Sequence, residues 1–318
     1  LYTQTEARSL VVTPDGRVVG LKVLMLPSGE IADKHKKLMA KGDLYQMLLP
    51  PSYPGANFLQ FFGNLFIKRA QKLERNHQQV KYIQAKKGVC LATGGFIFNR
   101  PMVKEYAPKY FSGMPLGTSN DQGSGIRLGQ SVGGKTDHMD RVTAWRFLNP
   151  PLAFAQGMVV NKEGLRFCNE MVYGATLGDA MCENNDGTAY LIVDASLFAE
   201  AKMQASTALP FQRDMARMLM YFNARKKTTI EEIAKVYNLP SDSLRASLEQ
   251  YNDSAKDAVP CQFGKAAEDV KELKGPFYIM DISITSKLAP LTTLTLGGLK
   301  VNEETGEVLN IAGNEIHG

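Results

Sequence analysis

The stretch KKGVCLATGGFIFNR, residues 86–100, decides the fold class of this chain. Its apolar run, residues 89–92, ends on Thr93 and a pair of glycines, Gly94 and Gly95. An apolar run of this length between glycines predicts a short strand buried on both faces, which is typical of a parallel sheet. Glycine pairs occur where a chain turns sharply or where another group approaches the backbone closely. Two interpretations stay open here: an ordinary strand-to-loop turn, and the edge of a ligand site.

The composition is that of an ordinary globular protein. The chain has 318 residues, of which 44% are apolar and 22% are charged, and this length is enough for two domains. The net charge of +5 is spread over many local clusters. Such mild basicity suits an anionic cofactor or substrate but is too diffuse to predict a nucleic-acid partner. No run of about 18 apolar residues occurs, so no membrane-spanning helix is predicted.

Cysteine and histidine usage indicates the compartment. The four cysteines are far apart and show no metal-ligand spacing, so we expect reduced, mostly buried thiols in a cytoplasmic protein. The four histidines are equally scattered, and no metal site is predicted. The chain begins with Leu1 and stops at Gly318. We expect both ends to be cut from a longer protein, so targeting signals could be missing.

Local patterns predict several elements. Residues 8–24 contain two Val-rich runs joined by Thr-Pro-Asp-Gly, which predicts a β-hairpin. Residues 43–75 are rich in Leu, Phe and Tyr, are interrupted by prolines and end in a basic helical pattern. Three interpretations stay open for this segment: a packed helical insertion, an apolar lid, and an element that contacts a membrane surface.

The second half of the chain is predicted to mix strands and helices. Residues 157–174 predict a strand, a turn and a second strand, and residues 189–197 predict another buried strand. Thr229 and Glu232 have the spacing of a capping box, which starts a helix that ends before Pro240.

Glycines also mark residues 119–134. Gly123, Gly125 and Gly129 imitate a dinucleotide-binding fingerprint, but a loop precedes them where that fingerprint requires a strand. We therefore interpret them as a glycine-rich helix start, whose N–H groups are free to face a cofactor or an oxygen anion.

Five motifs occur in the order found in one flavoprotein family: KGVCLATGGFIFNRPMV, GMPLGTSNDQGSGIRLGQSVGG, GMVVNKEGLRFCNE, GPFYIMD and TLGGLKVN. Over nearly its whole length the chain resembles the FAD-dependent oxidoreductase 2 family. This family includes fumarate reductase and succinate dehydrogenase flavoproteins and the 3-ketosteroid Δ1-dehydrogenases. The resemblance looks closest to the ketosteroid-dehydrogenase-like members.

The resemblance implies an α/β fold in which a partial FAD-binding Rossmann-like domain carries an inserted α+β cap domain. Residues 1–140 and 284–318 are the expected FAD-binding part, and residues 141–283 are the expected cap, which carries the substrate site. The family's GxGxxG unit and its C-terminal flavin-contacting helix have no counterpart in the 318 residues. We therefore expect this chain alone to bind FAD weakly or not at all.

The resemblance also implies which residues contact FAD. The family's Gly-Asp-Gly motif aligns with residues 123–125, where Ser124 replaces the Asp and leaves that contact in doubt. The two Gly-Gly corners are expected to approach the flavin together. The implied FAD-binding residues are Ala7, Ala92, Thr93, Gly94, Gly95, Ser124, Gly125, Gly297 and Gly298.

The chemistry implied by the resemblance is oxidation of an apolar, 3-ketosteroid-like substrate. The fumarate reductase motifs have an Arg and a His where this chain has Gly174 and Leu294, which disfavours dicarboxylate reduction. Ketosteroid dehydrogenases place a tyrosine after the Asn-Glu of the cap hairpin, and Tyr173 lies three residues after Glu170, where four is usual. Tyr173 is thus the candidate proton-abstracting base, and a structural tyrosine is the alternative.

Trp145 and Glu170 are the candidate substrate-binding residues. The alternatives are core packing for Trp145 and an ion pair with Arg166 for Glu170. Two further functions stay open: reduction of another enoate by a fumarate-reductase-like flavoprotein, and a non-catalytic flavoprotein scaffold. The sequence predicts no oligomeric state.

Overall fold

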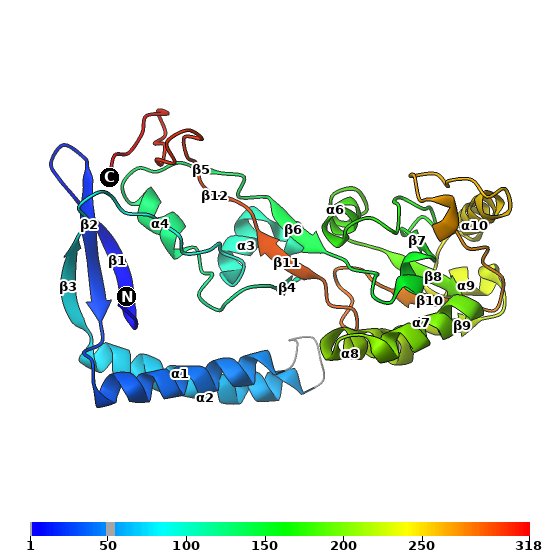
Figure 1. Cartoon of the computed structure of the whole chain (residues 1–318), viewed down its shortest axis with the longest axis horizontal. Helices are drawn as coiled ribbons and strands as arrows, with labels where there is room; N and C mark the ends of the chain where they lie inside the picture. Colours follow the sequence, from blue (N-terminus) through cyan, green and yellow to red (C-terminus); the bar gives the residue numbers. More distant parts are fainter. Residues whose placement is uncertain (1, 49–54) are drawn as a thin grey trace. The chain divides into compact units, whose positions relative to one another are not determined.

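The computed structural model describes residues 2–48 and 55–318 (Figure 1). The chain divides into two compact units. The first unit comprises Leu1–Ala107, Gly117–Val142 and Thr295–Gly318, and the second comprises Pro108–Leu116 and Thr143–Leu294. The roles of FAD-binding domain and cap, which the sequence assigns to residues 1–140 with 284–318 and to residues 141–283, stay predictions.

The first unit contains a three-stranded antiparallel sheet of order β1-β2-β3. Its strands are β1 (Thr5–Val12), β2 (Val18–Met25) and β3 (Gln79–Gln84). The hairpin predicted over residues 8–24 is confirmed by the pairing of β1 with β2. At its turn Gly16 has a φ of 90°, and its amide donates to the Thr13 carbonyl at 2.9 Å. A left-handed residue at this position is the conformation that glycine adopts without a steric cost.

Two long helices, α1 (Glu30–Met47) and α2 (Ala56–His77), form an antiparallel hairpin (Figure 1). They approach closely at two buried glycines, because a Cβ atom at Gly63 would lie 2.9 Å from the Gly42 carbonyl oxygen. His35 is buried and its Nε2 lies 2.7 Å from a Glu74 carboxylate oxygen. The prolines at 50, 51 and 54 in the predicted segment 43–75 lie outside the described residues.

The strand predicted over residues 89–92 is wrong. This segment has no strand assignment, and Cys90 and Ala92 are exposed. Its backbone is held by Val89, whose amide donates to the Gly318 carbonyl at 2.6 Å. A strand buried on both faces requires neighbouring strands in its sheet. Within residues 2–48 and 55–318, no strand pairs with this segment.

Short elements complete the first unit. The side chain of Asn99 caps α3 by accepting a hydrogen bond from the Met102 amide at 3.3 Å. The short elements of the first unit are the helices α3 (Arg100–Tyr106) and α4 (Ser124–Gln130) and the strands β5 (Thr136–Asp137) and β12 (Gly298–Leu299). The two strands pair antiparallel.

The second unit is built on a four-stranded antiparallel sheet of order β7-β8-β10-β9. Its two central strands supply fully buried side chains, among them Ile192 and Ile279, which lie opposite one another. A second sheet of order β4-β11-β6 belongs mainly to this unit, with β4 and β11 parallel. The strands are β4 (Met114–Pro115), β6 (Val142–Trp145), β7 (Met158–Val160), β8 (Tyr190–Asp194), β9 (Arg225–Lys227), β10 (Phe277–Asp281) and β11 (Thr292–Thr295).

Helices surround the four-stranded sheet in the second unit (Figure 1). The capping box predicted at Thr229 is confirmed, because its side chain accepts from the Glu232 amide and Glu232 accepts from the Thr229 amide. The helices are α5 (Leu152–Ala155), α6 (Gly174–Asn184), α7 (Ala195–Thr207), α8 (Pro210–Met218), α9 (Ile230–Val236) and α10 (Ser241–Lys256), with short turns at Pro108–Tyr110, Leu219–Asn223 and Ala267–Asp269.

The second strand predicted within residues 157–174 is also wrong. Only a single bridge, between Val160 and Arg166, follows the turn after β7. The physical reason is that Arg166 turns into the interior and forms an ion pair with Glu170. The chain between Arg166 and Glu170 therefore forms a bend and a turn instead of a strand.

Candidate functional site

A cavity of about 620 Å³ lies within the first unit, and we call it the glycine cavity. This volume falls in the range of about 300–1,000 Å³ that small-molecule sites occupy. Both Gly-Gly corners contribute to its wall, although they are 200 residues apart in the sequence. The lining includes Thr93, Gly94, Gly125, Gly129, Gly297 and Gly298 together with the aliphatic side chains of Leu91, Ile126, Val132, Leu299 and Val308.

The structure explains why the first corner needs its two glycines. A Cβ atom at Gly94 would collide with a carboxylate oxygen of Asp121, and one at Gly95 would collide with the hydroxyl of Thr295. The Asp121 carboxylate also accepts from the Thr118 amide at 2.8 Å. Asp121 thus holds the corner in place, a role that the sequence analysis missed. Its only sequence signal is a position two residues before Gly123 in a glycine-rich loop.

The second corner contains two glycines with different surroundings. A Cβ atom at Gly297 would collide with the backbone of His138, so this glycine permits close packing within the protein. At Gly298 a Cβ atom would meet no protein atom within 4 Å. Gly298 lines the glycine cavity, so it is the glycine of this corner that leaves space for a ligand.

The start of α4 differs from the sequence-based interpretation. The Gly125 amide is not free, because it donates to the Thr93 hydroxyl at 3.0 Å. A Cβ atom at Gly125 would collide with that same hydroxyl, so the small residue permits the contact. This hydrogen bond joins the first corner to α4 and fixes one wall of the glycine cavity.

The cavity brings together five of the nine residues predicted to contact FAD: Thr93, Gly94, Gly125, Gly297 and Gly298. The other four do not line it. Ala7 is half-buried in β1, and Ala92 is exposed. The space that a side chain at Gly95 would need is occupied by the hydroxyl of Thr295. Ser124 is the first residue of α4. Contact between FAD and any of the nine stays a prediction.

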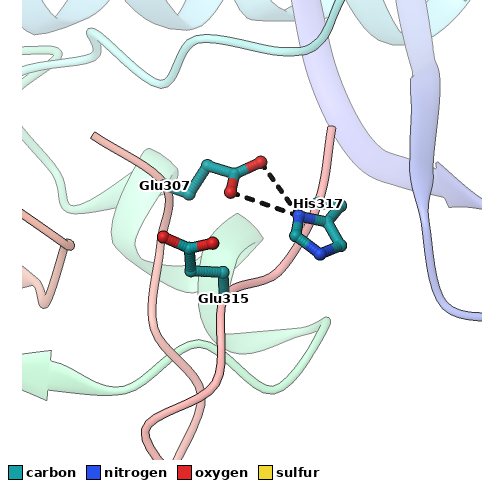
Figure 2. A group of neighbouring side chains, drawn as sticks. All are labelled: Glu307, Glu315 and His317. Carbon is teal, nitrogen blue, oxygen red and sulfur yellow. Dashed lines mark hydrogen bonds and ion pairs between the residues drawn. The ribbon is translucent and has the colours of Figure 1, made fainter. Parts of the chain in front are cut away.

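Figure 2 shows three neighbouring titratable side chains, Glu307, Glu315 and His317, of which Glu307 lines the glycine cavity. Their ligand atoms lie within 4.8 Å of one another, a grouping that the scattered histidines did not predict. Each side chain has a protein partner. Glu315 accepts from Asn302 at 2.6 Å and from Thr305 at 2.8 Å, and His317 lies 3.1 Å from Glu307. Hydrogen bonds within the loop thus account for the grouping.

A second cavity, of about 260 Å³, lies within the second unit, and we call it the aromatic cavity. Phe147 and Tyr173 line it, and their rings pack edge-to-face with centroids 5.8 Å apart. The Trp145 ring lies 5.9 Å from Phe147 and 6.5 Å from Tyr173. Trp145 also donates to Thr143 at 2.8 Å. Tyr173 is 61% exposed.

Glu170 contributes to the wall of the aromatic cavity, but its carboxylate is directed into the protein. One oxygen accepts from the Val159 amide and from Arg166 Nε, both at 3.0 Å. The other accepts from Arg166 Nη2 at 2.8 Å and from Lys265 Nζ at 3.3 Å. Glu170 therefore forms the ion pair with Arg166 that was the alternative to substrate binding.

Two cations share this buried carboxylate. Burial disfavours the charged form of Arg166, but the ion pair with Glu170 outweighs that effect and raises the pKa of the guanidinium. Burial lowers the pKa of the Lys265 ammonium, and Glu170 offsets part of the effect. Lys265 also donates to the Gly157 carbonyl at 2.8 Å, and it lies 2.9 Å from the Tyr251 hydroxyl. The cluster fixes the chain on the N-terminal side of Tyr173.

A buried arginine lies next to the aromatic pair and was not singled out from the sequence. Arg146 donates to the Ala289 carbonyl at 2.9 Å, while its Nε has no hydrogen-bond partner. Burial lowers the pKa of Arg146 to about 10. The Arg146 amide donates to the Gly174 carbonyl at 2.9 Å, which connects β6 to the start of α6 beside Tyr173.

The structure combines helices and sheets in each of two units, and comparisons with known proteins identify the family of the chain. Residues 1–318 match the family described as the FAD binding domain. The chain belongs to this family, whose cofactor is FAD, and the resemblance stated from the motifs is confirmed.

Relatives and a solved structure refine this assignment. The 3-oxo-5-alpha-steroid 4-dehydrogenase of Comamonas testosteroni is 35% identical over 325 residues, which cover 99% of this chain and 58% of the relative. A 3-oxosteroid 1-dehydrogenase of Mycobacterium tuberculosis is 27% identical over 230 residues, which cover 65% of this chain and 40% of the relative. The resemblance to ketosteroid dehydrogenases is thereby confirmed.

The predicted fold class is confirmed by a solved structure. A 3-ketosteroid-delta4-(5alpha)-dehydrogenase from Rhodococcus jostii RHA1, crystallised with 4-androstene-3,17-dione, matches with a TM-score of 0.70 at 23% identity. The match covers 99% of this chain and 51% of that one. The chain thus spans about half the length of the proteins that it matches.

The residues of the glycine cavity fit FAD. Backbone and aliphatic side chains form much of its wall, which suits a flat ring system or an extended chain, and Lys87 and Glu307 add charged groups. The space beside Gly298 is free of protein atoms. Thr93, Gly94 and Gly298 are the residues that would hold the cofactor there. When bound, FAD supplies a two-electron acceptor for hydride.

Proposed function

We propose that the protein oxidises a 3-ketosteroid-like ketone and introduces a carbon–carbon double bond next to the carbonyl. The observation that carries the proposal is the aromatic cavity, where the exposed Tyr173 packs its ring against Phe147 and Trp145. Phe147 and Tyr173 offer aromatic rings to one side of a flat apolar substrate, and a tyrosine can accept a proton. The ketosteroid dehydrogenases among its relatives support the same substrate class.

Each residue has a specific task in this proposal. Tyr173 would take the proton from the carbon next to the ketone. A bound FAD would supply the acceptor for the hydride of the adjacent carbon. Phe147 lines the cavity and packs against the steroid-like ring system, whereas Trp145 does not line the cavity and supports the rings of Phe147 and Tyr173. Glu170 does not contact the substrate, but with Arg166 it fixes the turn that carries Tyr173.

The relatives differ in the bond that their names specify, at carbon 4 in one case and carbon 1 in the other. The Δ1 reaction was the one expected from the motifs. We propose 3-ketosteroids as the substrate class. The structure of the product will show which carbon–carbon bond becomes the double bond. Reduction of an enoate is the second candidate, but the apolar residues Gly174 and Leu294 offer no group to bind a carboxylate.

The proposal is tested with the protein produced from its complete reading frame and loaded with FAD. A saturated 3-ketosteroid and an artificial electron acceptor dye are supplied, and the product is analysed by mass spectrometry and NMR. We expect the dye to be reduced and the steroid to lose two hydrogen atoms. Reduction of fumarate or acrylate by reduced viologen, with no steroid oxidation, would favour the second candidate. Stoichiometric FAD without either activity would favour a scaffold.

A location follows from the same proposal. No helix within residues 2–48 and 55–318 is long and apolar enough to cross a bilayer. We propose a cytoplasmic protein that contacts the membrane peripherally, because steroid-like ketones partition into bilayers. The helical segment within residues 43–75 is the proposed contact.

A further inference from the structure

One face of α2 exposes a row of large apolar side chains. Their exposed fractions range from 37% at Phe62 to 67% at Phe58. The row consists of Phe58, Phe61, Phe62 and Leu65, and we call it the apolar stripe. Its members are spaced i, i+3, i+4 and i+7, which places them on one side of a helix. In a globular protein the apolar stripe of a helix normally faces the protein core, whereas the apolar stripe of α2 faces outward.

The same face of α2 changes character along its length. Lys68, Arg69 and Lys72 continue the spacing of the apolar stripe and are exposed. The same order recurs on α1, where the exposed residues Lys37 and Lys41 precede the exposed residues Leu44 and Leu48 at helical spacing. Because the helices are antiparallel, the apolar halves of both lie at one end of the hairpin and the basic halves at the other (Figure 1).

The hairpin carries most of the excess charge of the chain. Residues 30–77 contain eight Lys and Arg against four Asp and Glu, which gives +4 out of a total of +5. An apolar surface beside clustered cations complements an anionic, amphiphilic surface. A neutral or basic protein partner would gain nothing from these charges.

The apolar stripe is held in place by the packing beneath it. Gly42 and Gly63 let the two helices approach closely, and Gln46 donates to Asn64 at 2.9 Å. The rings of Phe58 and Phe62 pack edge-to-face with centroids 4.9 Å apart. The stripe is therefore preformed and does not have to be released from a core before it binds.

We propose that the apolar end of the α1–α2 hairpin binds the surface of an anionic lipid bilayer. The apolar stripe enters the boundary between headgroups and acyl chains, while Lys68, Arg69 and Lys72 contact lipid phosphates. At about 1.5 Å per residue the stripe extends roughly 10 Å along the axis of α2. A hairpin that enters by its apolar end would therefore place the stripe within about 10 Å of the surface, a depth that apolar faces of interfacial helices also reach. The basic residues then lie about one headgroup layer above it. This proposal rests on the peripheral membrane contact of the proposed function, but it does not depend on steroid oxidation.

The test is vesicle flotation of the protein produced from its complete reading frame. Vesicles of phosphatidylcholine alone are compared with vesicles of equal parts phosphatidylcholine and phosphatidylglycerol. We expect binding to the anionic vesicles that weakens with added salt. Phe58→Ser/Phe61→Ser should weaken it about 100-fold, because each buried Phe contributes roughly tenfold or more. A matched control, Tyr82→Ser/Ile311→Ser, changes two large side chains of the same unit that are more exposed than the Phe pair, and it should bind unchanged.

A second set of variants tests the charges. Replacing Lys68, Arg69 and Lys72 with Gln should weaken binding about fivefold per charge. Replacing Lys86, Lys104 and Lys135, which are exposed elsewhere in the first unit, should have little effect. Gel filtration and circular dichroism verify that each variant folds, and Leu44→Ser/Leu48→Ser replaces the Phe pair if that variant does not fold.

Three outcomes would overturn the proposal. The first is a wild-type chain that floats with neither kind of vesicle, and the second is equal binding by the wild type and the Phe variant. The third is self-association that the Phe variant abolishes in the absence of lipid, which would assign the stripe to a second copy of the chain. A wild-type protein that binds anionic vesicles but does not oxidise a 3-ketosteroid would count against the proposed steroid oxidation alone.

Discussion

Arg166 and Glu170 form a two-pronged ion pair inside the second unit, with Nε to Oε1 at 3.0 Å and Nη2 to Oε2 at 2.8 Å. Both side chains are almost fully buried, and Lys265 is a second cation at the same carboxylate. A buried cation without a partner is costly, so the carboxylate of Glu170 is the element on which the cluster depends.

Glu170→Gln should lower the free energy of unfolding by about 3–5 kcal/mol, because two buried cations lose their counter-charge. Urea denaturation can be followed through Trp145, which is the single tryptophan of the chain and lies in β6. Glu163→Gln is the control, since this half-exposed side chain lies on the same unit 3.9 Å from Lys162 and should change stability by less than about 0.5 kcal/mol. Equal effects from the two variants would contradict the assigned role.

Gly94→Ala should destabilise the first unit for two reasons. The φ of 72° costs an L residue about 1 kcal/mol, and the added methyl collides with Asp121. Gly133→Ala is the matched control, because its φ is 91° and no atom lies within 4 Å of the new methyl. We expect the Gly94 variant to lose at least about 1 kcal/mol more than the control. Amide hydrogen exchange across residues 94–123 measures the difference.

The cysteines should differ sharply in reactivity. Cys90 is exposed, whereas Cys168, Cys182 and Cys261 are buried. Burial raises the pKa of the Cys182 thiol to about 12 and also raises the pKa of the Cys168 thiol, so few thiolates form at mildly alkaline pH. Iodoacetamide should therefore modify Cys90 alone in the native chain and all four in urea, as counted by mass spectrometry. Native modification of Cys182 would show that the second unit opens readily.

Features set by neighbours in the sequence could be predicted. The Pro-Asp-Gly turn between β1 and β2 and the capping box at Thr229 depend on residues within a few positions of each other. The strand expected at 89–92 failed for the opposite reason, because a strand is stabilised by pairing with distant segments. Its apolar composition was compatible with a strand but could not supply the neighbouring strands.

The candidate site shows the same limit. The glycine-rich corners could be recognised from the sequence, and they do line one cavity. What the sequence could not show is which glycine has which neighbour: Asp121 fills the space at Gly94, while Gly298 has open space. Likewise, Arg166 and Lys265 are 99 residues apart, and only the fold brings both to Glu170.

Gly298→Val tests the glycine cavity as the FAD site. The position has no left-handed backbone conformation and no protein atom within 4 Å of a new Cβ atom, so the folded protein should tolerate the side chain. The valine would instead fill the space left for the cofactor. In the protein from the complete reading frame, we expect at least about tenfold weaker FAD binding, measured by flavin fluorescence, with unfolding unchanged. Gln130→Val, on α4 of the same unit but outside the cavity, is the control. Unaltered affinity in the Gly298 variant would place FAD elsewhere.

Tyr173→Phe tests the proposed proton-abstracting base in the FAD-loaded protein. A positioned base contributes about 10²–10⁴-fold, so turnover of a 3-ketosteroid should fall by that order. Flavin binding and the free energy of unfolding should change little, because the side chain is 61% exposed and the ring that packs against Phe147 is kept. Tyr221→Phe, at a 64% exposed tyrosine of the same unit, is the control and should retain full turnover. A structural tyrosine predicts the reverse, with stability lost and activity per folded molecule retained. Full turnover in a stable Tyr173→Phe protein would falsify the catalytic role and leave the aromatic cavity as a substrate-binding feature only.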